Sequence, residues 1–368
     1  MKHTKQMLAF LLSLLLLLTA LPGMAESGKV TVLGKAYPAD TQELNLDNTR
    51  LRDETQLLKD LKKLPNLKSV SLENTGLKAK HLSNLFDAFP EVMFLASFEL
   101  FGVPLHTTQI EADLGNAQVT GYQTFQWGIN AMPNLTHMKA FGATLTQVRY
   151  EEILTKHPGL KLDCTLRFLR YSARTDITAF STRKGNEAPF WKNKDFEVLK
   201  YFPNLKALDL GHNRVNDLSF LRQWPGLKIL IMADNAIEDL SVIGEMTELE
   251  YLELFMNPFT DVSPLVNLTK LKDLNIAWTS AADVSPLSQM TWLERLWLSN
   301  IKPKLPEGQV DALRAALPNT EINDTARLAT QEGWRDHPRY LVQANIFGTR
   351  IYRDWDEPAD PNAKYFYQ

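Results

Sequence analysis

The sequence predicts an α/β solenoid, in which each turn adds one short strand to a parallel sheet on the concave side and one helical or 3₁₀ segment to the convex side. The first observation behind this prediction is a spacing of 22 residues between successive leucines, at Leu205, Leu227, Leu249, Leu271 and Leu293. Such a period lies in the range of stacked repeat proteins. The second is the alternation of apolar residues, as at Leu208 and Leu210, which is typical of a short strand with one buried face.

Each of these leucines opens the phrase LxxLxLxxN, and its asparagine stands where the chain leaves the strand. The asparagine is present at Asn213, Asn235 and Asn257, whereas Thr279 and Ile301 occupy the position in the last two copies. An inward-pointing Asn can bond backbone groups that a buried bend would otherwise leave unpaired. We therefore expect a structural role for these side chains.

Aspartates with a serine two residues later follow the first four phrases, at Asp217, Asp239, Asp261 and Asp283. This pattern suits the capping of a short helical segment on the convex side. The alternative is a ladder of metal ligands, but Ca²⁺ requires about six to eight oxygen ligands at one point. One carboxylate per turn is too few, so we expect no metal site and no cofactor.

The repeats resemble a known family. The segment LKDLNIAWTSAADVSPL, Leu271 to Leu287, is close to the phrase LxxLxLxxNxIxDhsPL of bacterial leucine-rich repeats of the internalin type. The resemblance covers about residues 205–301, which is under a third of the chain. It implies a right-handed horseshoe that binds other molecules, and it names no partner.

Residues 1–25 predict a secretory signal peptide. Lys2 and Lys5 precede an apolar run, and Gly23 and Ala25 stand at the small-residue positions of a cleavage site. The alternative is an uncleaved membrane anchor, for which the apolar run is short. We expect an exported, soluble protein, secreted or periplasmic, without stable membrane insertion after cleavage.

The rest of the chain divides into four predicted parts. After a lead-in at 26–43, residues 44–190 form two degenerate 68-residue repeat units with extended insertions, because a shift of 68 places Leu46 and Asn48 on Leu114 and Asn116. Each copy contains room for helices and an extended stretch with a hairpin, at Gly102 in the first copy and at the sequence YSART in the second. Residues 191–323 hold the regular 22-residue repeats.

Residues 324–368 are predicted to form a capping tail, because a solenoid needs a cover for its exposed core. Five aromatic residues are expected to pack against the scaffold: Trp334, Tyr340, Phe347, Tyr352 and Trp355. His337, with Arg335 and Arg339, suits either an anion site or the anchoring of the tail by hydrogen bonds.

No signature of an enzyme is present. The sequence has no GxSxG, no HExxH and no phosphate-binding glycine loop, although Glu111, Asp113, His106 and His137 are polar groups near predicted strands that could converge. The single cysteine, Cys164, lies in a strand-like segment and is expected to be a buried thiol. A net charge of -3 argues against nucleic acid as a partner.

The concave side is the expected binding site, because strand residues between the inward leucines must face outward there. The candidate partner-binding residues are Asp209, Tyr251, Glu253, Phe255, Met256, Asp273, Trp278, Arg295 and Trp297. Such a cluster of aromatic and charged residues is typical of a recognition surface.

We therefore predict a non-catalytic, exported module that binds a protein or peptide. The alternative function is a glycan-binding module of the cell envelope. A flat, coplanar row of rings favours sugar and a pocketed cluster favours protein. A further alternative is that the C-terminal tail or a flanking loop covers the aromatic residues.

Overall fold

A computed structural model describes residues 28–182 and 189–357. The predicted signal peptide at 1–25, residues 183–188 and the last part of the predicted tail, 358–368, lie outside the described residues. The described residues form two compact units, 28–112 with 120–135, and 113–119 with 136–182 and 189–357. No helix among the described residues is both long and apolar enough to cross a membrane.

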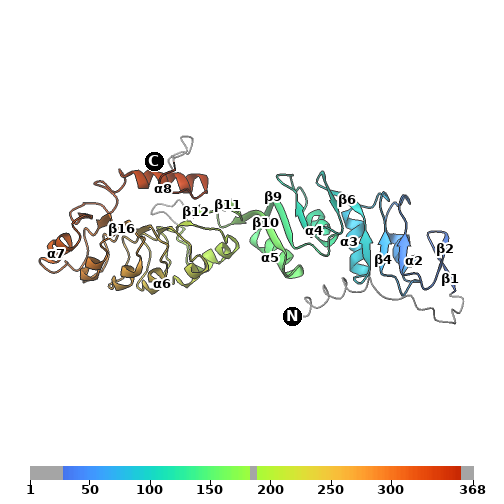
Figure 1. Ribbon diagram of the computed structural model, residues 1–368, viewed down its shortest axis with the longest axis horizontal. Helices are drawn as coiled ribbons and strands as arrows, with labels where there is room; N and C mark the ends of the chain where they lie inside the picture. The colour runs from blue at the N-terminus through green and yellow to red at the C-terminus, as the bar shows by residue number, and fades with distance from the viewer. Residues whose placement is uncertain (1–27, 183–188, 358–368) are drawn as a thin grey trace, which may run out of the picture. The chain divides into compact units, whose positions relative to one another are not determined.

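The first unit contains a parallel sheet of three short strands (Figure 1). Each central strand residue, such as Val70, is buried, while its neighbours are exposed or half-buried. The strands are β3 (Glu43–Asn45), β4 (Ser69–Ser71) and β5 (Met93–Leu95). The hairpins are β1 (Lys29–Val32) with β2 (Lys35–Pro38) and β6 (Ser97–Leu100) with β7 (Val103–His106), and the helices are α2 (Thr55–Leu61), α3 (Ala79–Ala88) and α4 (Tyr122–Asn130).

The extended stretches form hairpins, as expected, although one turn differs in position. The β6–β7 turn is made by Phe101 and Gly102, both with positive φ. In the second unit, β10 (Lys161–Phe168) reverses into β11 (Tyr171–Arg174) at Leu169, whose φ is 49°. The expected reversal at YSART was therefore wrong, because Leu169 takes the left-handed conformation and YSAR continues the pairing.

Elements recur 68 residues apart in the two units. Helix α5 (Gln147–Lys156) matches α3, and β9 (His137–Thr146) begins where β4 would fall after that shift. The strand β8 (Glu111–Asp113) lies at the division between the units. The duplication itself stays a prediction.

The second unit continues into a parallel sheet of seven strands in sequence order. The register pairs residues one turn apart, such as Leu208 with Leu230 and Leu230 with Leu252, so the predicted 22-residue turn is confirmed. The strands are β12 (Ala179–Ser181), β13 (Ala207–Asp209), β14 (Ile229–Ile231), β15 (Tyr251–Glu253), β16 (Asp273–Asn275), β17 (Arg295–Trp297) and β18 (Glu321–Asn323). The convex connections are η2 (Asn193–Tyr201), η3 (Ser219–Gln223), α6 (Ser241–Gly244), η4 (Ser263–Asn267), η5 (Ser285–Gln289) and α7 (Gln309–Ala316), where η marks a 3₁₀ helix.

The asparagines join neighbouring turns, as predicted. The amide of Asn235 donates from Nδ2 to the carbonyls of Leu210 (3.0 Å) and Met232 (3.1 Å), and its Oδ1 accepts from the backbone amide of Val215 at 2.9 Å. Asn257 repeats this pattern one turn later. These side chains are buried and hold the bend after each strand.

The aspartates hold the start of each convex segment. Asp217, Asp239, Asp261 and Asp283 each accept a hydrogen bond at 2.8 Å from the backbone amide two residues later. This satisfies a donor at a helix start that has no partner within the helix. Among the described residues, no group of three or more potential metal ligands is present.

Candidate functional site

The strands β12 to β17 are buried on both faces. All three residues of each of these strands are buried, whereas β3 alternates between exposed and buried. Residues 324–357, here named the C-terminal cover, explain the difference. They include α8 (Pro338–Thr349) and lie on the strand side of the solenoid, opposite α6 (Figure 1).

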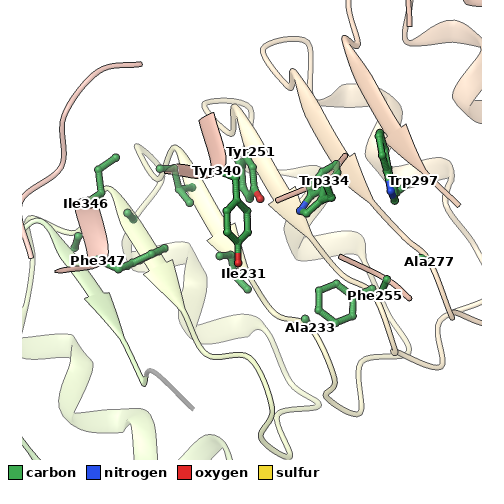
Figure 2. Packing of buried hydrophobic residues seen from close by; sticks show 14 of the residues in the cluster. Ile231, Ala233, Tyr251, Phe255, Ala277, Trp297, Trp334, Tyr340, Ile346 and Phe347 are labelled. Carbon is green, nitrogen blue, oxygen red and sulfur yellow. The ribbon is translucent and has the colours of Figure 1, made fainter. Parts of the chain in front are cut away.

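One half of the cover makes an apolar contact with the sheet. Ile346 and Phe347 of α8 belong to the same buried cluster as Ile231 (Figure 2), and this cluster also contains Ala207 and Ile229. Beyond α8, the backbone amide of Tyr352 donates to Thr178 Oγ1 at 2.6 Å. This half resembles an ordinary second layer of core.

The other half of the cover makes polar contacts centred on Asp273, which is fully buried. The Asp273 carboxylate accepts two hydrogen bonds from Arg295, at 2.8 and 2.9 Å, and two from Arg339 of the cover, both at 2.7 Å. Burial raises the pKa of Asp273, but the two guanidinium groups outweigh it and hold that pKa below its usual range. The carboxylate therefore stays ionised and ties the cover to β16 and β17.

Glu253 forms a second polar contact, one turn earlier. Its carboxylate accepts from the Tyr251 hydroxyl and, at 2.9 Å, from the indole Nε1 of Trp334 in the cover. Burial raises the pKa of Glu253, and the hydrogen bonds from Tyr251 and Trp334 only partly offset it. Side-chain amides of the repeats also donate to cover carbonyls, from Asn275 to Ala329 and from Asn300 to Ala326.

A row of residues with left-handed backbone conformation follows the strands. Their φ angles are 50–59°, and the row consists of His212, Asp234, Met256, Trp278 and Asn300. This conformation is unfavourable for residues other than Gly, Asn and Asp. Met256 is 40% exposed and Trp278 is 38% exposed, so two large apolar side chains lie one turn apart at the carboxyl edge of the sheet.

One protein family matches part of the repeats. The family described as "Leucine Rich repeats (2 copies)" matches residues 203–245. The matched segment consists of leucine-rich repeats. With the seven parallel strands, this part of the chain forms a leucine-rich repeat solenoid.

Solved leucine-rich repeat structures are similar at low identity. An internalin of Listeria monocytogenes is 18% identical, covering 78% of this chain and 70% of its own, with a TM-score of 0.34. Internalin C2 of the same organism is 20% identical, covering 59% and 80%, with a TM-score of 0.33. A leucine-rich repeat protein of Leptospira interrogans is 15% identical, covering 78% and 96%, with a TM-score of 0.29. No curated protein matches the sequence.

Most of the predicted binding residues of the leucine-rich repeats are inaccessible. Met256 and Trp278 are exposed, and the buried ones are Asp209, Tyr251, Glu253, Phe255, Asp273, Arg295 and Trp297. The expectation of an open concave surface at these seven positions was wrong, because the C-terminal cover packs on them. Their role in binding a partner stays a prediction.

The aromatic rings of the face are tilted. The Trp334 ring makes angles of 46° with Tyr251 and 60° with Trp297, and it lies between them (Figure 2). Trp334 of the cover is therefore packed at an angle to both rings of the concave face.

The possible anion site of the tail is used for anchoring. Arg339 bonds Asp273 and, at 2.6 Å, Glu294, while His337 Nδ1 accepts from the Arg339 backbone amide at the start of α8. Burial, with Arg295 and Arg339 nearby, lowers the pKa of His337. The hydrogen-bond alternative is thus confirmed for Arg339, whereas Arg335 is exposed.

The polar groups considered for catalysis have separate partners. His106 bonds Glu73 at 2.9 Å in the first unit, and His137 bonds Asp163 at 2.7 Å in the second. Cys164 is buried, as expected, and burial raises the pKa of its thiol. A buried thiol with a raised pKa is a poor nucleophile.

Sequence reasoning missed one open polar hollow in the second unit. Its volume is about 490 Å³, and its lining includes Lys139, Phe141, Asp163 and Arg174. The Arg174 guanidinium lies 3.6 Å from the centre of the Phe141 ring. The alternation of polar and apolar residues in β9 and β10 was a signal for this exposed strand face.

Proposed function

We propose that this chain is an exported, non-catalytic module that binds a protein or peptide through the concave side of its leucine-rich repeats. The partner first meets the repeats at the carboxyl edge of the sheet. The binding residues are those predicted from the sequence, of which Met256 and Trp278 are accessible while the cover is in place.

The exposure of Met256 and Trp278 is the observation that carries this proposal. Parallel strands in one sheet lie about 4.8 Å apart, so equivalent side chains of adjacent turns form a continuous patch. Both residues are held in a strained backbone conformation that any Gly or Asn would adopt more easily. Exposed indole and thioether groups are typical of binding hot spots.

The arrangement of the rings supports a protein or peptide partner over a glycan. Sugar binding needs ring faces that are accessible, but Tyr251 and Trp297 are buried and tilted against Trp334. The polar side chains of the concave face suit a peptide backbone instead, because the Asn275 side-chain amide donates to a backbone carbonyl of the cover.

The sequence supports an exported compartment. The signal peptide predicted at residues 1–25 supports secretion or a periplasmic location. Expression of the full chain in its host, followed by mass determination of the exported form, tests this part. A chain that keeps residues 1–25 and stays in the membrane fraction contradicts it.

Site-specific crosslinking tests the binding surface. The full chain is prepared with p-benzoylphenylalanine, a photoreactive aromatic residue, in place of Trp278, and is irradiated with secreted and envelope proteins of the host. We expect one dominant protein adduct, which Met256→Ala reduces. A parallel incubation with envelope glycans tests the alternative function.

The matched control carries the same photoreactive residue in place of Val148 of α5, which is 74% exposed and lies on a helix of the same unit. An adduct formed equally well from both positions refutes the site. A glycan that binds the full chain and is lost in Trp278→Ala favours the alternative.

A further inference from the structure

The recognition face of the leucine-rich repeats already holds a peptide, which is the protein's own C-terminal cover. The side chains that hold it come from positions facing the concave side of β15 to β17. Two of them are carboxylates that accept hydrogen bonds from the cover. Glu253 accepts from an indole N–H, and Asp273 accepts from a guanidinium group. The contacts are those of a peptide-recognition surface, made within one chain.

The polar half of the cover has little regular structure. Residues 324–337 contain turns and bends, and Glu332 and Gly333 both have positive φ, at 56° and 103°. This half is held by side-chain anchors and not by a helix or a strand ladder. Segments held by few regular hydrogen bonds open at lower free energy than the core.

The interface also leaves buried polar atoms unmatched. Trp297 Nε1, Ser299 Oγ and both amide atoms of Gln343 have no hydrogen-bond partner. Trp297 and Ser299 lie on and just after β17, and Gln343 lies on α8 of the cover. Native cores pair nearly all such atoms, and each unpaired one costs free energy.

The unmatched atoms are confined to this interface. Among the residues that the structure describes, no buried side-chain polar atom elsewhere lacks a partner. The contact between cover and sheet is therefore less complete than the rest of the interior. A competing segment that satisfied these atoms would gain free energy relative to the cover.

We infer that the C-terminal cover is a tethered, displaceable occupant of the recognition face, and that the partner carries a peptide segment with the same anchors. The segment presents an indole N–H to Glu253 and a guanidinium to Asp273, spaced as Trp334 and Arg339 are. This inference rests on the proposed function, whose concave face it assigns to one class of ligand. In the free protein the cover keeps the face closed.

Tethering sets how strongly a competitor must bind. A tethered segment acts at an effective concentration on the order of millimolar, so a free peptide binds weakly while the cover is intact. The apparent dissociation constant equals the intrinsic one divided by the open fraction. Weakening the cover without changing the face should therefore tighten the binding of a free peptide.

The test uses the full chain and a synthetic peptide of its own residues 325–349 with a fluorescent label. Arg339→Gln in the full chain removes three hydrogen bonds of the cover, two to Asp273 and one to Glu294, while Asp273 stays paired with Arg295. We expect this variant to bind the peptide about tenfold more tightly than the unchanged chain. A peptide with Trp334→Phe should bind the variant more weakly, because it cannot donate to Glu253.

Arg327→Gln is the matched control. Arg327 is exposed on the same segment, and its backbone amide donates to Glu332. The control makes the same change of charge and should leave peptide affinity at the unchanged level. Equal affinities of the Arg339 and Arg327 variants overturn the inference.

Hydrogen exchange gives a second readout that needs no ligand. We expect the amides of residues 325–340 to exchange at least tenfold faster than those of β13 to β16. Exchange of both groups at one common rate shows a permanent core layer and overturns the inference. Neither measurement uses the external partner, so a failed crosslink at Trp278 with positive results here counts against the proposed function alone.

Discussion

The buried pair of Asp273 and Arg295 provides the sharpest test of the energetics. Asp273→Asn keeps the shape of the side chain and removes its charge. The Arg295 side chain is 2% exposed, so its guanidinium cannot turn to water, whereas Arg339 keeps Glu294 as a partner. The variant therefore leaves one uncompensated buried charge.

Removal of one partner from a buried ion pair costs about 3–5 kcal/mol. Asn still accepts one hydrogen bond through Oδ1, so we expect a loss of about 3 kcal/mol in the free energy of unfolding at pH 7. The measurement is urea denaturation of the full chain, followed by tryptophan fluorescence. Adding Arg295→Met to Asp273→Asn should restore most of the loss, because no buried charge then remains.

Arg222 and Glu245 supply the matched control. They also form a two-bond pair one turn apart, with both distances at 2.8 Å, but their side chains are 52% and 53% exposed. Water screens such a pair, so Glu245→Gln should change the stability far less than Asp273→Asn. Equal losses in the two variants would refute the argument from burial.

Acid offers a further check on the same pair. The pKa of Asp273 is lowered in the folded state, so its contribution is complete above the unfolded-state pKa of about 3.9 and disappears as the pH falls through the folded value. The stability difference between the unchanged chain and Asp273→Asn should therefore shrink below about pH 4. A difference that persists at lower pH contradicts the assignment.

Three further predictions concern other buried contacts. Asn235→Ala should lower the free energy of unfolding by about 2 kcal/mol, because the buried Val215 amide loses its hydrogen bond to Asn235 Oδ1 in the next turn; urea denaturation measures this. Glu253→Gln should raise the stability of the protein at pH 7 but not at pH 4. Because the pKa of Glu253 is raised in the folded state, the unchanged chain loses stability as the pH rises above the unfolded-state pKa of about 4.3. Thermal unfolding at both pH values tests this. Gly244→Ala should lower the free energy of unfolding by about 1–3 kcal/mol, because the added Cβ would lie 2.7 Å from a backbone oxygen of the next turn. The control Gly226→Ala places its Cβ where no atom lies within 4 Å, so it should not destabilise the chain. Urea denaturation compares the two variants.

The repeats could be predicted from the sequence because their determinants are local or one turn away. Asn235 bonds groups in its own turn and in the preceding one, so the same side chain recurs wherever the same bend recurs. The Asp–Ser pairs act over two residues. A period in the sequence therefore becomes a period in the structure.

The sequence predicted a capping tail, and it also held a signal that this tail covers the strands. The apolar run from Ile229 to Ala233 is continuous, and such runs are typical of strands buried on both faces. Alternation at Leu208 and Leu210 was read as a strand with one buried face, which left the neighbouring positions assigned to solvent. The apolar positions Ile229 and Ile231 needed a second layer.

The sequence by itself determined the solenoid, its 22-residue register and the structural roles of its asparagines and aspartates. Only the tertiary structure decided which concave residues face solvent. Arg339 meets Asp273 across 66 residues, and Trp334 meets Glu253 across 81. No spacing in the sequence encodes these contacts, because they depend on the path of the chain after the last strand. That path leaves Met256 and Trp278 exposed and buries Tyr251 and Trp297.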